Sequence, residues 1–233
     1  GVTEGNIGSA RIIKMLDVAN DSLVVNSKGL YSIENYLMAR RLMYWQVYLH
    51  KTTVSSEKVL VNALLRAKQL AHEGKDIFAT PCLKYFLYND VGAETFKNDE
   101  EAQHNYALLD DNDIWSAIKV WIYNDDKVLS LLSADLLNRK LFKVEISGTP
   151  IDEERTEGIK ATLANKFGIS KEEAEYLISV DTIQKDMYDV HDDHITILFK
   201  DNTLKDISEA SEVMNIASLS KKIRKYYLCY QRF

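Results

Sequence analysis

The stretch IENYLMARRLMYWQVYLHK, from Ile33 to Lys51, decides how this chain is interpreted. Its apolar and aromatic side chains recur at three- and four-residue spacing, which is typical of one face of an amphipathic helix. The residues with that spacing are Tyr36, Leu37, Met43, Tyr44, Val47 and Tyr48. The pattern predicts a long helix from Ile33 to Leu49, with Ser32 at a position where its hydroxyl could cap the first turn.

Polar groups gather at one end of this predicted helix. Arg40 and Tyr48 are eight residues apart and so lie roughly 80° from each other around a regular helix, and His50 and Lys51 follow directly. Such a cluster suits an anionic ligand. The pattern alone nevertheless favours a simpler interpretation, in which the arginines extend from a core helix and His50 complements the helix dipole.

Helical patterns dominate the rest of the first 140 residues. The predicted elements are a helix at Ser9–Val18, an extended segment at Ser22–Ser27, a helix from Thr53 or Ser55 through Ala71, a helix or strand at Thr80–Asn89, and an antiparallel pair of helices at Asp111–Asn124 and Asp126–Arg139. Gly74 would end the third of these, and the acidic run at Asp110 is expected to cap the first helix of the pair. These elements predict a helical region over residues 1–140.

The pattern changes after Arg139. Predicted strands at Leu141–Ser147, Tyr176–Thr182, His194–Lys200, Thr203–Ser208 and Lys225–Tyr230 accompany a helix at Asp152–Phe167 that ends at Gly168. The fold class expected is therefore mostly α, with a smaller α+β C-terminal subdomain over residues 141–233.

Composition excludes several classes of protein. The 29 basic and 35 acidic residues give a net charge of −6, which argues against a general nucleic-acid surface but allows a local basic pocket. Cys82 and Cys229 lack a metal-binding spacing and are a poor basis for a disulfide framework. No apolar run approaches the length of a membrane helix and no signal pattern is present, so we expect a cytoplasmic protein.

A metal site would need a cluster of ligands, and the sequence offers one dense group, DVHDDH from Asp189 to His194. His191 and Asp192 lie just before a predicted strand. A His-Asp pair without further ligands is a weak signal, and we interpret the segment as a polar turn. No metal site is expected in this chain.

The long helix resembles the helix that follows the catalytic core in HD-superfamily phosphohydrolases, particularly deoxynucleoside triphosphate triphosphohydrolases of the sterile-alpha-motif/HD-domain type. The resemblance implies that Arg40 contacts substrate phosphate and that Tyr48 packs beside the nucleoside. It also implies that the chain, which opens GVTEGNIGSARIIKML, is the C-terminal portion of the enzyme. The divalent metal (Mg, Mn, Fe, Ni or Zn) would then be held by an HD core upstream, and this chain alone would be inactive; a tag remnant at Gly1 is the alternative explanation of that start.

The resemblance extends to SARIIKM, NRKLFK and DHITILFK. It implies a regulatory nucleotide site, with parts from different subunits of a homo-oligomer, formed by Arg11, Lys28, His50, Lys51, Arg139, Lys143 and Lys200. Taken singly, each of these cations is more simply explained as a solvated surface residue. Taken together, they favour a site for a deoxynucleotide substrate or effector.

The chain also departs from the family pattern. Leu49 replaces a glutamine that helps to select the substrate, and Asn26, Ser32 and Met15 replace other residues of the regulatory site. Two alternatives therefore stay open. The region could be a non-catalytic assembly module, or the parent enzyme could hydrolyse another phosphate ester.

Overall fold

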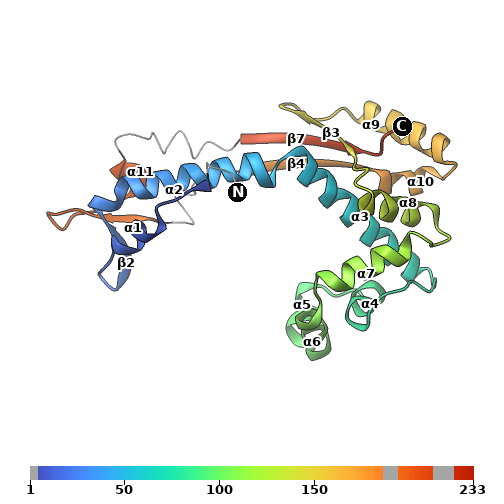
Figure 1. The fold of residues 1–233 in the computed structure, drawn as a ribbon, viewed down its shortest axis with the longest axis horizontal. Coiled ribbons are helices and arrows are strands. Elements are labelled where there is room, and N and C mark those ends of the chain that lie inside the picture. The colour runs from blue at the N-terminus through green and yellow to red at the C-terminus, as the bar shows by residue number, and fades with distance from the viewer. Residues whose placement is uncertain (1–4, 186–193, 212–222) are drawn as a thin grey trace. The chain divides into compact units, whose positions relative to one another are not determined.

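Helices make up most of the computed structural model, which describes residues 5–185, 194–211 and 223–233. Contacts divide the chain into two compact units (Figure 1). Unit 1 contains Gly1–His50 and Thr182–Lys225, and unit 2 contains Lys51–Asp181 and Tyr226–Phe233. This grouping differs from the sequence-based division into residues 1–140 and 141–233, which stays a prediction.

Unit 1 begins with helix α1 (Ser9–Lys14) and the hairpin of β1 (Leu16–Ala19) and β2 (Ser22–Asn26). Asn20 and Asp21, with φ of 53° and 57°, form the two-residue turn, as the type I′ hairpin requires. The sheet order is β1-β2-β5-β6, where β5 is Thr196–Leu198 and β6 is Leu204–Asp206. Strand β2 pairs with β5 in parallel, whereas the other neighbours are antiparallel.

Helix α2 (Leu30–Met43) covers this sheet and buries Ile33, Glu34, Leu37 and Ala39, so Leu37 is the one residue of the predicted apolar face that is buried in it. Its Ile33 and Leu37 share a core with Val25 and Ile197 and with the short helix α11 (Ile207–Ala210). A short 3₁₀-helix (Ser27–Gly29) precedes it, so Gly29 caps α2 and the expected cap, Ser32, lies inside the helix. The predicted helix start was wrong by three residues.

The second half of the long helix is not regular. A π-helix follows α2 at Tyr44–Tyr48, where the Leu49 N–H donates to the Tyr44 carbonyl over 2.8 Å. No residue of this segment is buried. Because the π-helix has an extra residue in its turn, the angle around the helix axis between Arg40 and Tyr48 differs from that of a regular α-helix. Short π segments occur frequently at functional sites.

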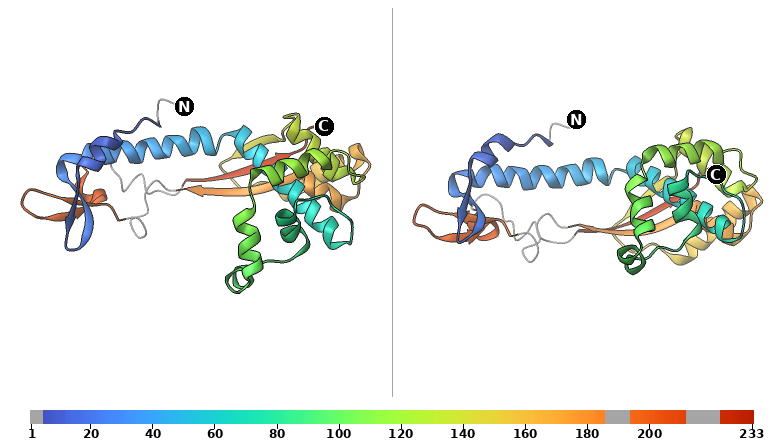
Figure 2. Two further views of the ribbon diagram at one scale, coloured as in Figure 1. Left: turned by 60° about the horizontal axis from the view of Figure 1, so that its bottom comes forward. Right: turned by 90° about the horizontal axis from the view of Figure 1, so that it is seen from below.

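Unit 2 contains six consecutive helices, of which α8 packs against both α3 and α7 (Figure 2). They are α3 (Lys51–His72), α4 (Pro81–Tyr88), α5 (Ala93–Asn98), α6 (Glu100–Leu108), α7 (Asp111–Trp121) and α8 (Lys127–Leu137). The predicted helices α7 and α8 are confirmed, as is the cap at Asp110, which forms a capping box with Asp113. Helix α3 begins at Lys51, so Thr53 and Ser55 lie within its first turns and are not its caps.

A three-stranded sheet lies mainly in unit 2, which holds all of one strand and parts of the other two. Its order is β3-β7-β4, from Lys143–Ser147, Ile223–Tyr230 and Ile178–Lys185, and β3 and β7 run antiparallel with Val144 opposite Cys229. Helix α9 (Glu153–Phe167) ends as expected at Gly168, whose φ is 61°. Helix α10 (Lys171–Ala174) and a 3₁₀-helix (Glu175–Leu177) lead into β4.

Further segments differ from the sequence predictions or were left open by them. The helix expected at Ser9–Val18 ends at Lys14, because Leu16–Ala19 pairs with β2 as strand β1. The ambiguous Thr80–Asn89 segment is helical, with Pro81 in its first turn. Helices α5 and α6 were not predicted. The mostly α fold with an α+β part is confirmed.

Candidate functional site

A basic pocket of about 350 Å³ lies in unit 2. Its walls come from the first turns of α3, from the loop between α8 and β3, and from the segment after β7. The pocket residues that carry a positive charge are Lys51, Arg139, Lys140, Lys143 and Arg232. The predicted residues Lys51, Arg139 and Lys143, which are up to 92 positions apart (143 − 51), therefore meet in one cavity.

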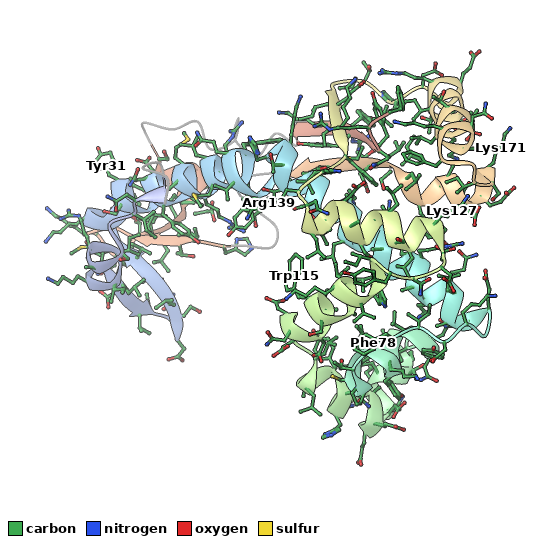
Figure 3. The ribbon with its side chains drawn as sticks, turned by 45° about the vertical axis from the view of Figure 1, so that its right-hand side comes forward. Tyr31, Phe78, Trp115, Lys127, Arg139 and Lys171 are labelled. Carbon is green, nitrogen blue, oxygen red and sulfur yellow. The ribbon has the colours of Figure 1, made fainter. Side chains whose placement is uncertain are left out.

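Arg139 occupies an unusual backbone conformation. It follows α8 with φ of 56°, the left-handed region that glycine usually supplies after a helix (Figure 3). Its N–H donates to the Leu136 carbonyl, and the Lys140 N–H donates to that of Asp135 over 2.8 Å. A left-handed non-glycine residue costs about 1–2 kcal/mol. This helix end thus keeps an arginine at an energetic cost.

Two hydrogen bonds hold the loop that carries Arg139. The Ser55 hydroxyl in α3 donates to the Phe142 carbonyl over 2.9 Å, and this bond is buried. The Arg232 Nε donates to the Leu141 carbonyl over 3.1 Å. The loop is therefore tied to α3 on one side and to the segment after β7 on the other.

Lys143 is held by an aromatic ring and a carboxylate. Its Nζ lies 5.4 Å from the centroid of the Tyr230 ring and 3.1 Å from Glu145 Oε1. The Tyr230 hydroxyl and then Glu145 raise the pKa of Lys143. The Tyr230 hydroxyl also lowers the pKa of Glu145 to about 2, with help from Lys143 and Arg155. Lys143 therefore keeps its charge and a defined position.

The electrostatics of the pocket suit a polyanion. Five cations converge in a protein of net charge −6, and α3 points its N-terminal end, where the helix dipole is positive, into the same space. Several lysine and arginine groups together can neutralise a triphosphate through charge-assisted hydrogen bonds. A purely structural explanation also exists for two of them, because cations after the C-terminal end of α8 complement its dipole.

The predicted substrate-contacting residues lie in unit 1. Arg40 is half-buried on α2, and Tyr48 closes the π-helix with 57% of its surface exposed. The Tyr48 ring lies 5.5 Å from the Tyr44 ring in a tilted arrangement. An exposed aromatic ring roughly two turns from an arginine has a face on which a sugar or base could stack, the role that the family resemblance implied for Tyr48.

The remaining predicted regulatory residues also lie in unit 1. Arg11 Nη2 donates to the Lys28 carbonyl over 3.2 Å, so these two residues are brought together. Both are exposed, as are His50 and Lys200, which follow the π-helix and β5 respectively. Asn26, which departs from the family pattern, accepts a hydrogen bond from the Lys28 N–H and caps the 3₁₀-helix.

Sequence reasoning missed two pocket residues. Lys140 is the third residue of NRKLFK and could have been found from its neighbours. Arg232 has no local signal, because only the pairing of β7 with β3 brings it to the pocket.

No group of three or more metal-ligating side chains occurs within the part of the chain that the structure describes. The candidate pair His191 and Asp192 lies outside the described residues. His194 Nδ1, just before β5, is 3.8 Å from Asp206 Oδ2, and Asp206 Oδ1 also accepts hydrogen bonds from the N–H and the hydroxyl of Ser208. No described helix is both long and apolar enough to cross a membrane.

Comparison with known proteins gives two kinds of similarity. Residues 7–78 match the family described as "HD associated region". The chain is also 29% identical over 237 residues to the uncharacterized protein YwfO of Bacillus subtilis (strain 168), covering 99% of this chain and 51% of that protein.

Two solved structures are also similar. A phosphohydrolase from Bacteroides thetaiotaomicron is 58% identical with a TM-score of 0.93, and the match covers 100% of this chain and 58% of that one. A hypothetical protein from Aquifex aeolicus is 23% identical with a TM-score of 0.60, covering 100% and 50% respectively, and shares the fold. The chain thus spans about half the length of these relatives. The chain is thus similar to the HD associated region over residues 7–78 and to a solved phosphohydrolase structure over its whole length.

Proposed function

We propose that this chain is the C-terminal portion of a metal-dependent HD phosphohydrolase that converts a deoxynucleoside triphosphate and water into a deoxynucleoside and triphosphate. In this proposal unit 2 binds a regulatory nucleotide through its basic pocket. The observation that carries it is the meeting of Lys51, Arg139 and Lys143 in one cavity. For each of these three residues the family resemblance implies contact with a regulatory nucleotide.

The chain contributes binding groups in this scheme and does not carry out the chemical step. Arg40 would bind substrate phosphate, and Tyr48, on the exposed side of the π-helix, would lie against the sugar or base. Arg11, Lys28, His50 and Lys200 would contact effector in a cytoplasmic homo-oligomer.

The divalent metal would be held by HD residues outside this chain. Its described residues do not fit a metal ion, because they bring together no set of three ligating side chains. We therefore assign no metal-dependent step to them.

The experiment is an assay for inorganic triphosphate released from each deoxynucleoside triphosphate with magnesium or manganese. It compares this chain with the same protein extended upstream. We expect activity only in the longer protein. Activity in the chain alone would refute its assignment as a non-catalytic portion, and release of orthophosphate would indicate a different phosphate ester chemistry.

Variants of the longer protein separate the two sites. Arg40→Ala should reduce turnover without changing effector binding, whereas Lys51→Ala with Lys143→Ala should reduce activation by added nucleotide. Lys97→Ala is a control, because its partner Glu94 lies in the same exposed helix α5, away from the pocket. Unchanged turnover in Arg40→Ala would refute the role of that arginine.

Exposed apolar side chains favour a second candidate, the assembly module. In unit 1, Ile13, Val18 and Leu23 expose 66%, 67% and 68% of their surfaces. Large apolar groups gathered on a surface often mark protein interfaces. If Leu23→Ser with Val18→Ser dissociated an oligomer in sedimentation experiments, and no nucleotide raised the melting temperature of the parent chain, the assembly module would be the better description.

A further inference from the structure

Arg232 lies in the basic pocket, although no sequence motif contains it. It belongs to the segment Tyr230–Phe233, whose members are each anchored. The Tyr230 hydroxyl donates to Glu145 Oε1 over 2.8 Å, and the Phe233 ring stacks on the Tyr230 ring at 5.7 Å. The Gln231 N–H donates to the Leu177 carbonyl over 2.8 Å. This segment is therefore a fixed wall of the pocket.

The guanidinium of Arg232 is oriented by one of these anchors. Its Nε donates to the Leu141 carbonyl, which uses one of the five N–H donors of the side chain. The planar fork also presents pairs of donors that match two oxygens of a phosphate. An arginine fixed at Nε is thus suited to contact phosphate without a large loss of side-chain entropy on binding.

The rest of the lining favours the phosphate groups of a nucleotide over its base. Besides the five cations, it contains the hydroxyl residues Thr52 and Ser55 and the apolar residues Leu141, Phe142 and Val144. Asn, Gln, Asp and Glu, whose side chains could read the edge of a base, are missing from these described lining residues. The Phe142 side chain is 2% exposed, so its ring is covered and offers no stacking face.

We propose that Arg232 contacts phosphate in the basic pocket, and that this pocket recognises the polyphosphate of its ligand irrespective of the base. The proposal rests on the proposed function, since it takes the pocket as a binding site. It extends that function by adding a residue and by defining the ligand class as polyphosphates, with or without a nucleoside.

The test is titration calorimetry on the 233-residue chain. The probes are inorganic triphosphate, dATP, dGTP and deoxyadenosine. We expect the three phosphate-containing probes to bind with dissociation constants within about threefold of one another, and deoxyadenosine to give no heat, because charge carries the recognition. Tight binding of only one of the two nucleotides would overturn base-independent recognition.

Arg232→Ala should lower the affinity for all three phosphate-containing probes by about tenfold, which is typical of losing one charge-assisted interaction. Arg232→Lys should recover part of the affinity, because it keeps the charge but loses the fork. The control is Lys166→Ala, since Lys166 Nζ contacts only the Arg232 carbonyl, at 3.5 Å, among the hydrogen bonds of the described residues and does not line the pocket.

The variants distinguish this proposal from the one on which it rests. If Arg232→Ala and Arg232→Lys bind like the unmodified chain while Lys51→Ala with Lys143→Ala does not, the role of Arg232 is refuted and the pocket stands. If no variant and no probe shows binding, the pocket itself is refuted. Circular dichroism of each variant identifies loss of folding, and the salt dependence of affinity should be shallower for Arg232→Ala.

Discussion

Gln231 Nε2 donates a 2.6 Å hydrogen bond to Asp135 Oδ2, and both side chains are buried. Burial raises the pKa of Asp135, an effect that the Gln231 hydrogen bond and Lys140 only partly offset. The Gln231 Oε1 is buried without a hydrogen-bond partner among the described residues. Because Gln231 precedes Arg232, this pair supports the wall of the basic pocket from behind.

Asp135→Asn is therefore expected to stabilise unit 2 at neutral pH. The amide of the introduced asparagine would still accept the bond from Gln231 and could donate one to the unpartnered Gln231 Oε1. The gain should be about 1 kcal/mol. Urea unfolding measures it, followed by the fluorescence of Trp115 and the buried Trp121, both in unit 2, in a Trp45→Phe background.

The same substitution gives a test in pH. A carboxyl with a raised pKa in the folded state binds its proton more tightly there than in the unfolded chain. Its contribution to stability is present at low pH and is lost as the pH rises through the folded pKa. The advantage of Asp135→Asn should thus shrink from pH 7 to pH 4, and an advantage that grew on acidification would contradict the assignment.

Arg66 and Asp126 give the opposite pH dependence. Arg66 is 6% exposed, and its Nε and Nη2 both bond to Asp126. Burial raises the pKa of Asp126, but the hydrogen bond from Arg66 and other effects outweigh it, and the net pKa is lowered. Asp126 stabilises the fold above the unfolded pKa near 3.9, and that stability is lost as the pH falls through the lower folded pKa.

Asp126→Asn should consequently destabilise unit 2, by less than the roughly 3–5 kcal/mol of a fully unpaired buried charge, because Arg66 Nη2 also bonds to Glu173 Oε1 over 3.1 Å. The asparagine can still cap α8 through the Leu129 N–H, so loss of the cap is not the cause. Asp125→Asn is the control, since Asp125 is exposed and precedes the cap. Equal unfolding midpoints for the two variants would refute the importance of the buried pair.

Gly29 is required in unit 1 because neighbouring side chains approach it closely. Its backbone conformation is not the reason, since a φ of −90° is open to any residue. A Cβ at this position would lie 2.7 Å from the Met15 Cβ and 2.9 Å from the Val25 Cγ1. Gly29→Ala should destabilise unit 1 by about 1–3 kcal/mol, as overpacking usually does. Thermal unfolding monitored by Trp45 fluorescence is the measurement.

Gly158→Ala is the matched control for Gly29→Ala. Gly158 lies in helix α9, and nothing is within 4 Å of a Cβ added there. Alanine should therefore stabilise this helix by about 0.5–1 kcal/mol. A Gly29→Ala protein as stable as the unmodified one would show that Met15 and Val25 can move aside.

Local sequence signals predicted most helices because their causes are local. Asp110 and Asp152 accept hydrogen bonds from backbone N–H groups in the first turns of their own helices, and Gly168 turns the backbone at the end of α9. These helix starts and this helix end were therefore predictable. The π-helix at Tyr44–Tyr48 and strand β1 were not predictable from local signals. Strand β1 depends on its pairing with β2, and an inserted residue in a helix leaves the apolar spacing almost unchanged.

The candidate site also contains residues that could be predicted from the sequence and one that depends on pairing between distant segments. Family resemblance selected Lys51, Arg139 and Lys143, and the structure placed them in one pocket. Arg232 was not predictable, because its position depends on the register of β7 against β3, in which Lys143 lies opposite Tyr230. The roles of Arg40 and Tyr48 stay predictions.

Arg139 provides a test in which stability and binding should change in opposite directions. Arg139→Gly removes the left-handed strain at φ 56° and should stabilise unit 2 by up to about 1 kcal/mol. It also removes a pocket cation, so affinity for inorganic triphosphate should fall about tenfold.

Arg139→Ala removes the same charge but keeps a Cβ in the left-handed conformation, so it should lose affinity without gaining stability. Urea unfolding of both variants gives the difference in their unfolding free energy, which is the cost of the left-handed backbone conformation. Calorimetry gives their affinities. If both variants kept the affinity of the unmodified chain, the strained arginine would have only a structural role at the end of α8. If both lost affinity and only glycine gained stability, the strain at this helix end would be explained by ligand binding.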